Sequence, residues 1–333
     1  MEWTADVAAG DWIRERLDNP WRGSMHGVVP RGFEAYARIF HPSTRDRPVG
    51  VAWPPEPYDE HPREWRRFQE AHPEIDDERS SWAQTATAFG TVFHPLAQWH
   101  RLVRQDGRHP GVSPTDAEGW RYSEPEEGQL DPELVAAASE VLAAHTTTPD
   151  DGFVAVWDGW GGLTGGLGYG PSRVLFALAG SDDQPADAAA AQHEDFLARS
   201  AQDQLNNAFR KPTWQPGVLS DDISKGPRLE LPARAHVLFR GGVRELADPA
   251  WPDRAPWRDG AQADAGFFPA VESPSLVWPA DRAWVLVSEV DFDSTIVGGS
   301  NAAIRALCAD PRLEALPIPA DADLTWDADE VNR

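Results

Sequence analysis

A chain of 333 residues, 41% of them apolar and sixteen of them tryptophan, can bury one large core or two modest ones, which excludes a wholly disordered protein. Fifty-four acidic and thirty basic residues give a formal charge of −24, which excludes broad binding of nucleic acid or membrane and favours a basic protein partner or cations. The single cysteine, Cys308, excludes an intrachain disulfide, and without a bilayer-length apolar run or a basic leader in "MEWTADVAAGDW" we expect a cytoplasmic protein.

The N-terminal half is predicted to combine short helices with one clear strand. Alternating side chains predict that strand at residues 33–40, "FEAYARIF", and a proline-rich loop is expected to follow at residues 41–62. Helices are predicted at residues 10–21, 62–72, 80–89, 91–103 and 131–145. The helix at 80–89 can be capped by Ser80 or Ser81, and the helix at 91–103 is expected to begin with a short strand.

The C-terminal half has more strand signals than the N-terminal half. Short apolar runs bounded by glycine or charge predict strands at residues 152–160, 172–180, 233–242 and 282–293. Helices are predicted at 188–209 and 300–310. Because helices and strands interleave without a regular βαβ rhythm, we expect an α+β or mixed α/β fold. Its central sheet is expected to be mostly antiparallel or mixed and to be flanked by helices.

Four segments occur in the order "VPRGFEAYARIFHP", "TTTPDDGFVAVWDGWGG", "LPARAHVLFRGG" and "WPADRAWVLVSEVDFDSTIVGGS". Together they resemble an actinobacterial family of hypothetical proteins to which no activity is attached. The resemblance implies one architectural unit over residues 28–316 and supplies no function. Residues 1–27 are then an N-terminal arm, 159–171 a glycine-rich insertion, and 317–333 an acidic tail whose end we expect to be exposed.

The strand predicted at residues 282–293 becomes acidic at its carboxyl end. Glu289, Asp291 and Asp293 stand at every second position, so a strand would place them on one face, about 7 Å apart. Carboxylates this close raise one another's pKa values unless a cation or a basic side chain relieves them. Oxygen ligands of this kind suit Mg²⁺ or Mn²⁺, so the three acids are candidate metal ligands. Thr295 and Ser300 follow shortly after and are candidate ligand-binding residues.

The letters "VDFDST" also resemble the nucleophile motif of haloacid dehalogenase-type phosphatases. The resemblance implies that Asp291 attacks phosphorus, that Asp293 serves as acid and base, that Thr295 takes the threonine place, and that Mg²⁺ neutralises charge. In that family the motif opens its domain, whereas here only 40 residues follow Asp293. The two lysines, Lys211 and Lys225, lie upstream, so the motif lacks its downstream partners.

The same stretch also fits a purely structural joint between a strand and a helix. Asp293 and Ser294 are common turn formers, and Gly298 and Gly299 allow a sharp turn. Ser300 can cap the helix that follows. We weigh this structural interpretation slightly ahead of a ligand-binding role, because isolated motifs often mislead.

A second candidate ligand site lies at "WDGW". Trp157, Asp158 and Trp160 can form the mouth of an aromatic-lined pocket, although buried packing is the commoner role of tryptophan. The glycines of "GGLGYG" precede a predicted strand instead of a helix, which argues against a dinucleotide cradle. His94 and His100 are six residues apart and do not form a metal-binding pair on one helix face.

Two classes of function remain open. In the first, the chain is a soluble acidic binding protein that recognises a basic protein partner, as an immunity protein or a regulator does. In the second, it is a divalent-metal-dependent hydrolase or phosphoryl-handling enzyme that uses Glu289, Asp291 and Asp293 with Mg²⁺ or Mn²⁺. We favour the first class, because the charge of −24 belongs to the whole chain whereas the acidic motif is short and incomplete.

Overall fold

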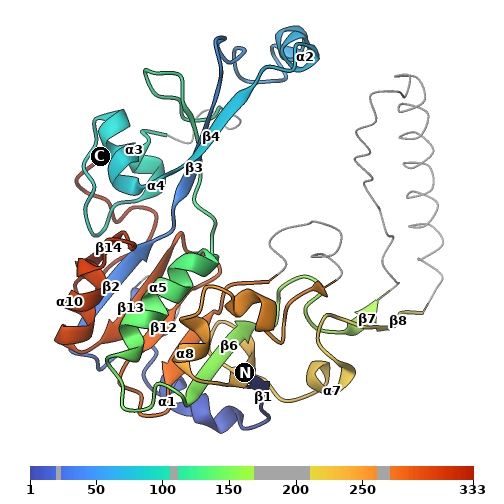
Figure 1. Cartoon of the computed structure of the whole chain (residues 1–333), viewed down its shortest axis with the longest axis vertical. Helices are drawn as coiled ribbons and strands as arrows, with labels where there is room; N and C mark the ends of the chain where they lie inside the picture. Colours follow the sequence, from blue (N-terminus) through green and yellow to red (C-terminus); the bar gives the residue numbers. More distant parts are fainter. Residues whose placement is uncertain (20–23, 106–111, 169–210, 261–270) are drawn as a thin grey trace. The chain divides into compact units, whose positions relative to one another are not determined.

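A computed structural model describes residues 1–19, 24–105, 112–168, 211–260 and 271–333 of the chain (Figure 1). The chain divides into two compact units. One unit comprises Met1–Gly159 and Pro227–Arg333, and the other comprises Trp160–Gly226. The strand predicted at 172–180 and the helix predicted at 188–209 lie outside the described residues.

The larger unit is built on an antiparallel sheet with the strand order β1-β10-β6-β11-β12-β13-β2-β14, and β9 also pairs with β10. Its strands are β1 (Glu2–Trp3), β2 (Ala35–Phe40), β6 (Gly152–Trp157), β9 (Leu229–Glu230), β10 (Ala235–Arg240), β11 (Leu276–Pro279), β12 (Val285–Val287), β13 (Ser294–Gly299) and β14 (Ala315–Ile318). Helices α5 (Pro132–Ala143), α8 (Val243–Leu246) and α10 (Asn301–Ala309) flank this sheet (Figure 1). The predicted α+β class with an antiparallel sheet is confirmed.

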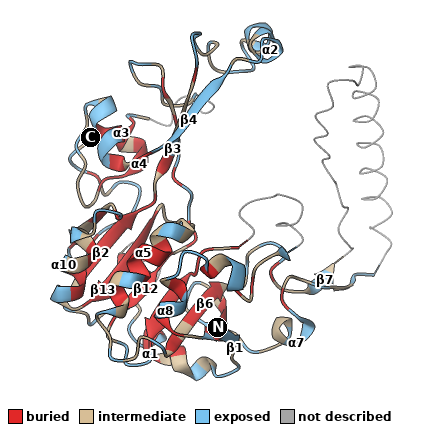
Figure 2. Ribbon diagram, viewed as in Figure 1, coloured by how far each residue is buried: buried red, intermediate tan, exposed pale blue. Residues whose placement is uncertain are grey.

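Both faces of the central strands are buried, which explains their nearly continuous apolar sequences. Neither β2 nor β13 has an exposed residue (Figure 2). The N-terminal segment, with η1 (Val7–Gly10), α1 (Asp11–Arg14) and η3 (Met25–Gly27), contributes to the core beside these strands. Trp12 and Trp278 meet edge to face in that core, with 6.3 Å between ring centres. The helix predicted at residues 10–21 is shorter than expected, because α1 begins at Asp11 and ends at Arg14.

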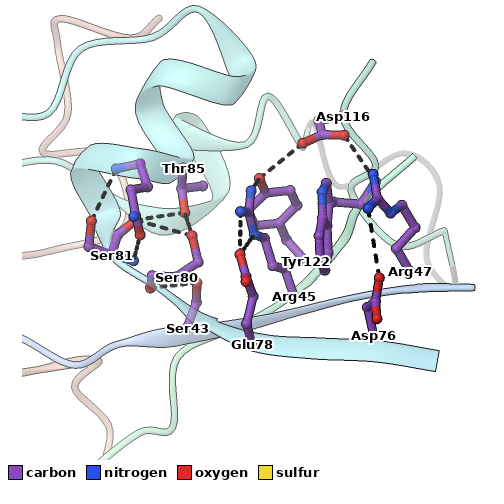
Figure 3. A network of polar contacts seen from close by, with 12 residues as sticks. Ser43, Arg45, Arg47, Asp76, Glu78, Ser80, Ser81, Thr85, Asp116 and Tyr122 are labelled. Atoms are coloured by element: carbon purple, nitrogen blue, oxygen red, sulfur yellow. Dashed lines mark hydrogen bonds and ion pairs between the residues drawn. The ribbon is translucent and has the colours of Figure 1, made fainter. Parts of the chain in front are cut away.

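A smaller sheet, in the order β4-β3-β5, is held by charged side chains. Its strands are β3 (Ser43–Pro48), β4 (Ile75–Ser80) and β5 (Arg121–Ser123). Arg45 on β3 pairs with Glu78 on β4 and donates to the Tyr122 hydroxyl (3.0 Å), and Arg47 pairs with Asp76 at 3.8 Å (Figure 3). The loop predicted at 41–62 is wrong for Ser43–Pro48, because cross-strand ion pairs take the place of an apolar alternation.

Three helices accompany the smaller sheet in sequence: α2 (Pro62–Glu70), α3 (Trp82–Phe89) and α4 (Trp99–Leu102). Ser81 and Gln84 form a reciprocal capping box at the start of α3, which confirms Ser81 as the cap. Residues 91–98 form no strand, and the helix expected at 91–103 is the short α4. The helix predicted at 131–145 is α5, with Pro132 in its first turn. Among the described helices, none is long and apolar enough to cross a membrane.

The unit Trp160–Gly226 begins inside the predicted glycine-rich insertion. Its described elements are the paired strands β7 (Gly166–Gly168) and β8 (Thr213–Gln215) and the short helix α7 (Asp221–Ser224). Trp214 donates to Asp221 at 2.7 Å, and Lys225 lies 4.3 Å from the Trp214 ring centre. The remaining short element, η4 (Trp251–Arg254), belongs to the larger unit.

Candidate functional site

The acidic stretch from Glu289 to Asp293 is a hairpin connection and not the end of a strand. β12 ends at Val287 and β13 begins at Ser294, and the Phe292 N–H donates to the Glu289 carbonyl (2.9 Å) in the turn between them. The strand predicted at 282–293 is therefore too long. Because the register pairs Val287 with Ile296, the acids fall outside the ladder, and the expected alternation of faces does not apply to them.

The two glycines after this connection are strand residues. A Cβ on Gly298 would lie 2.7 Å from Cδ2 of Phe33, so close packing requires glycine at this position of β13. The sharp turn predicted at Gly298 and Gly299 is wrong for this reason. Ser300 does cap α10, since its Oγ accepts a hydrogen bond from the Ala303 N–H at 3.2 Å.

Two of the three predicted carboxylates share one arginine. Arg234, which precedes β10, forms ion pairs with both Glu289 and Asp291, and its guanidinium lies 4.9 Å from the centre of the Trp157 ring. Burial raises the pKa of Glu289, and the bond from Arg234 opposes this shift. A basic side chain thus relieves the repulsion that the sequence led us to expect.

The third carboxylate, Asp293, pairs with a different arginine. Arg38 on β2 is buried, and its guanidinium donates to Asp293 Oδ1 (2.9 Å), to Ser294 Oγ (2.8 Å) and to the Ala97 carbonyl (2.7 Å). Burial lowers the pKa of Arg38, and the charge of Asp293 opposes this shift. Asp293 therefore serves as the counter-ion of a buried cation.

Thr295 lies in a buried chain of hydrogen bonds away from the surface. His41 Nδ1 donates to the Glu126 carbonyl (2.7 Å), and burial lowers the pKa of His41 to about 4. The imidazole is then neutral near pH 7, so its Nε2 accepts from the Thr295 hydroxyl at 2.9 Å. Ser288 Oγ lies 2.6 Å from Thr295 Oγ1 and completes the chain. These contacts give Thr295 a structural role in the core.

The three acids are consequently divided between two arginines and do not surround a common centre. Within the described ranges, no group of three or more His, Cys, Asp or Glu side chains could hold a metal ion. The structure does not bring Glu289, Asp291 and Asp293, the ligand set expected for Mg²⁺ or Mn²⁺, around a common centre, and one oxygen of each carboxylate accepts a hydrogen bond from a guanidinium group.

Beside these ion pairs lies a cavity of about 170 Å³. Asp291, Phe292 and Asp293 line it together with Arg38. The rest of the lining comes from the start of α4, from the segment after β5 and from the C-terminal segment. The lining residues are Arg38, Gln98, Trp99, His100, Glu124, Pro125, Glu127, Asp291, Phe292, Asp293, Ser294, Leu324 and Trp326. Of the candidate residues from the sequence, Asp291 and Asp293 line the cavity, whereas Glu289, Thr295 and Ser300 do not.

The cavity has an excess of negative charge. Two of its four carboxylates are paired with arginine, but Glu124 and Glu127 form no ion pair or side-chain hydrogen bond with any described residue. Burial, followed by the nearby carboxylates of Asp291, Asp293 and Glu124, raises the pKa of Glu127. A cation entering the cavity would relieve this repulsion, so the site is suited to a positively charged ligand.

Aromatic rings form another part of the lining. The Trp326 indole stacks on the His100 imidazole, with 3.6 Å between ring centres and 5° between planes. Trp326 as a whole residue remains 63% exposed, so one ring face covers His100 while much of the residue stays open to solvent. Gln98 Nε2 and His100 Nε2 are buried with no hydrogen-bond partner among the residues that the structure describes, and both residues belong to the lining. Buried polar atoms without a hydrogen bond are uncommon, so these two nitrogens mark a part of the wall where a ligand could supply the missing partner.

The C-terminal segment that carries Trp326 is fixed to the body of the unit. Asp329 is fully buried and accepts hydrogen bonds from His94 Nε2 (2.9 Å) and from the Gln98 N–H (3.2 Å). Asn332 adds a bond to the Val92 carbonyl at 3.0 Å. The last residues, Glu330, Val331 and Arg333, are exposed as expected, but the buried Asp329 anchors the segment, which contributes Leu324 and Trp326 to the cavity wall.

The second predicted ligand site is divided by the fold. Trp157 ends β6 beneath the Arg234 guanidinium, and Asp158 pairs with Arg228 at 3.1 Å. Trp160 begins the other compact unit. The three residues therefore do not all belong to one unit.

Several residues of the cavity carry no sequence signal of function. Arg38 was visible as a single charge in an apolar strand, but its partner Asp293 lies 255 positions away. Glu124, Glu127 and Trp326 stand in loops whose proximity depends on the tertiary fold. Comparison with protein-family models, with curated proteins and with solved structures finds no match to this chain. The family resemblance of the four motifs therefore stays a prediction.

Proposed function

We propose that this chain is an acidic binding protein that recognises a basic protein partner, and that the cavity beside Asp291 and Asp293 receives a cationic side chain of that partner. The observation that carries this proposal is that Glu124 and Glu127, two carboxylates with no ion-pair partner among the described residues, lie in a cavity that also has aromatic walls. Carboxylates and aromatic faces are the two kinds of group that stabilise a cation removed from water.

The global charge supports the same proposal at longer range. A charge of −24 attracts a basic partner over a distance set by the Debye length, about 8 Å at physiological ionic strength. Such steering raises the association rate, whereas contacts inside the cavity slow dissociation. A metal-dependent hydrolase finds less support, because Glu289, Asp291 and Asp293 are divided between Arg234 and Arg38.

A binding experiment with the full chain tests this proposal. The probe is a fluorescently labelled peptide rich in arginine and lysine, and the readout is fluorescence anisotropy at several salt concentrations. In the double variant E124Q/E127Q we expect an affinity loss of roughly 100-fold or more, since it removes two charge-assisted contacts worth about 1.5–3 kcal/mol each.

The matched control is E15Q/E118Q, which removes the same two charges from exposed side chains outside the cavity. If the charge of the whole surface is responsible for binding, both double variants lose affinity equally and the cavity has no special role. If the native chain does not bind the basic peptide at low salt, the proposed function is wrong.

A further inference from the structure

Several arginines in the described part of the chain lie on a tryptophan ring and also pair with a carboxylate. Arg121 lies 3.7 Å from the ring centre of Trp53 and pairs with Asp46. Arg234 lies over Trp157 and pairs with Glu289. A guanidinium can combine these contacts because it stacks with its face and donates hydrogen bonds with its edge.

The smaller sheet repeats the arrangement twice on one ring. Arg45 and Arg47 both lie 4.4 Å from the centre of the Trp120 ring, while their side chains pair with Glu78 and Asp76 respectively. In these four arginines, the aromatic face and the carboxylate act together on one planar cation. A guanidinium can make the same two contacts, stacking on an indole and donating to a carboxylate, wherever an indole face and free carboxylates line one cavity.

Trp326, Glu124 and Glu127 provide an indole and two carboxylates in one cavity, and no arginine among the described residues pairs with either glutamate or lies over the Trp326 ring. Trp326 uses one ring face to stack on His100 and is still 63% exposed. Asp291 and Asp293 already have arginine partners, so Glu124 and Glu127 are the carboxylates left for a ligand. The cavity therefore supplies an indole face and two acceptors, the partners that the arginines above contact elsewhere in the molecule.

We infer that the cavity selects an arginine side chain over a lysine side chain, and that Trp326 is the residue that determines this specificity. This inference rests on the proposed function, in which a cationic side chain enters the cavity. The guanidinium would stack on Trp326 and donate to Glu124 and Glu127. A lysine ammonium is a compact, strongly hydrated charge that loses more hydration on the same indole and cannot donate as a planar fork.

The deciding measurement compares two small probes, N-acetyl-arginine methylamide and N-acetyl-lysine methylamide, on the native full chain. Binding is followed by NMR through the indole Nε1–H signal of Trp326, identified by its loss in W326L. We expect the arginine probe to bind roughly 10-fold more tightly than the lysine probe, which corresponds to about 1.4 kcal/mol. In W326L the two affinities, measured by calorimetry, should become similar, and W326F should restore part of the preference.

Equal binding of the two probes to the native chain would overturn the arginine preference while leaving the proposed recognition of cations intact. An unchanged preference in W326L would also overturn it, because Trp326 would then not set specificity. Failure of both probes and of the basic peptide would instead contradict the proposed function. The two affinities of the native chain can also be measured by calorimetry, which needs no variant, so a folding defect in W326L cannot obscure the arginine preference.

Discussion

Arg38, at the centre of β2, forms an ion pair of 2.9 Å with Asp293, which ends the connection between β12 and β13. Only 2% of the Arg38 side chain is exposed, whereas 21% of the Asp293 side chain is exposed. The pair thus joins the interior of the sheet to the wall of the cavity. Asp293, which the sequence motif suggested as a catalytic or metal-binding acid, therefore has a structural role as the partner of Arg38.

Removal of one member of this pair should destabilise the fold strongly. In R38M the carboxylate loses its cation, and in D293N the buried guanidinium loses its counter-ion, so we expect losses of about 3–5 kcal/mol in the free energy of unfolding. Urea unfolding followed by circular dichroism measures this change. The control is R14A, which breaks an exposed pair with Asp11 and should change stability by about 0–1 kcal/mol. Losses of equal size in R14A and R38M would contradict the structural role.

Two buried histidines should make the fold sensitive to mild acid. Burial lowers the pKa of His41 and of His236 to about 4. The unfolded chain, with histidine pKa values of about 6.5, then binds more protons than the folded chain between these pH values, so stability falls as the pH drops through that window. The upper limit is about 3 kcal/mol for each histidine. Unfolding free energies should therefore decline from about pH 6.5 to about pH 5 in the native chain.

The variant H41N tests the histidine that contacts Thr295. We expect it to be less stable than the native chain at neutral pH, because the buried hydrogen bonds are altered, but to lose less stability on acidification. H72N, which changes an exposed histidine, should keep the native dependence on pH. Stability that does not change over this window in the native chain would show that His41 is not held neutral by burial.

The fold class was predictable because its signals are local. The apolar runs that became β2, β6 and β10 indicate strands without knowledge of their neighbours, and Ser300 indicates a helix cap by itself. β3 was missed because its order depends on Arg45 and Arg47 meeting Glu78 and Asp76, residues more than twenty positions away. The spacing of apolar residues along a segment indicates its burial and its secondary structure, but it does not identify a distant ion-pair partner.

The candidate site was predictable only in part, for the same reason. Asp291 and Asp293 were singled out as acids and do line the cavity, but the sequence does not reveal that Arg234 and Arg38 neutralise them. Glu124 reaches the cavity through the smaller sheet and Trp326 through the C-terminal segment. Both placements follow from tertiary contacts, such as the bond from the Gln98 N–H to Asp329, that have no local sequence signal.

Divalent cations should stabilise the chain little. Since the arginines contact the three carboxylates of the sequence motif, we expect about 1 mM Mg²⁺ or Mn²⁺ to shift the melting temperature no more than an equal ionic strength of NaCl. Differential scanning fluorimetry compares the two conditions directly. A shift specific to Mn²⁺ that disappears in D291N would contradict this prediction and restore the metal-dependent hydrolase as the better proposal.

The C-terminal segment should depend on the ionised carboxylate of Asp329. Burial acts to raise the pKa of Asp329, but hydrogen bonds from Asn332, His94 and Gln98 outweigh it and hold the pKa below its ordinary value. Its contribution to stability is therefore present above the ordinary aspartate pKa and is lost as the pH falls through the lowered value. D329N should release the segment at neutral pH and increase its cleavage by carboxypeptidase.

D327N is the matched control for this segment. Asp327 is exposed and lies 3.5 Å from Arg101, so its replacement should leave the cleavage rate close to that of the native chain. Loss of the Trp326–His100 stacking in D329N should also change the fluorescence of Trp326, read as the difference from W326F. Cleavage at the same rate in D327N and D329N would mean that Asp329 does not anchor the cavity wall.

Cation binding should strengthen as the pH rises through the pKa of Glu127. Burial and the neighbouring carboxylates raise this pKa, so Glu127 is protonated over a wider range of acid pH than an ordinary glutamate. A bound cation favours the ionised form, and the affinity for N-acetyl-arginine methylamide should therefore increase as the pH rises above the ordinary glutamate range and level off above the raised pKa of Glu127. E127Q should bind the probe as the protonated native chain does and should show a flatter profile, whereas E118Q should retain the native one. A native profile that is flat across this range, or a rise that persists unchanged in E127Q, would exclude Glu127 as a cation-binding group.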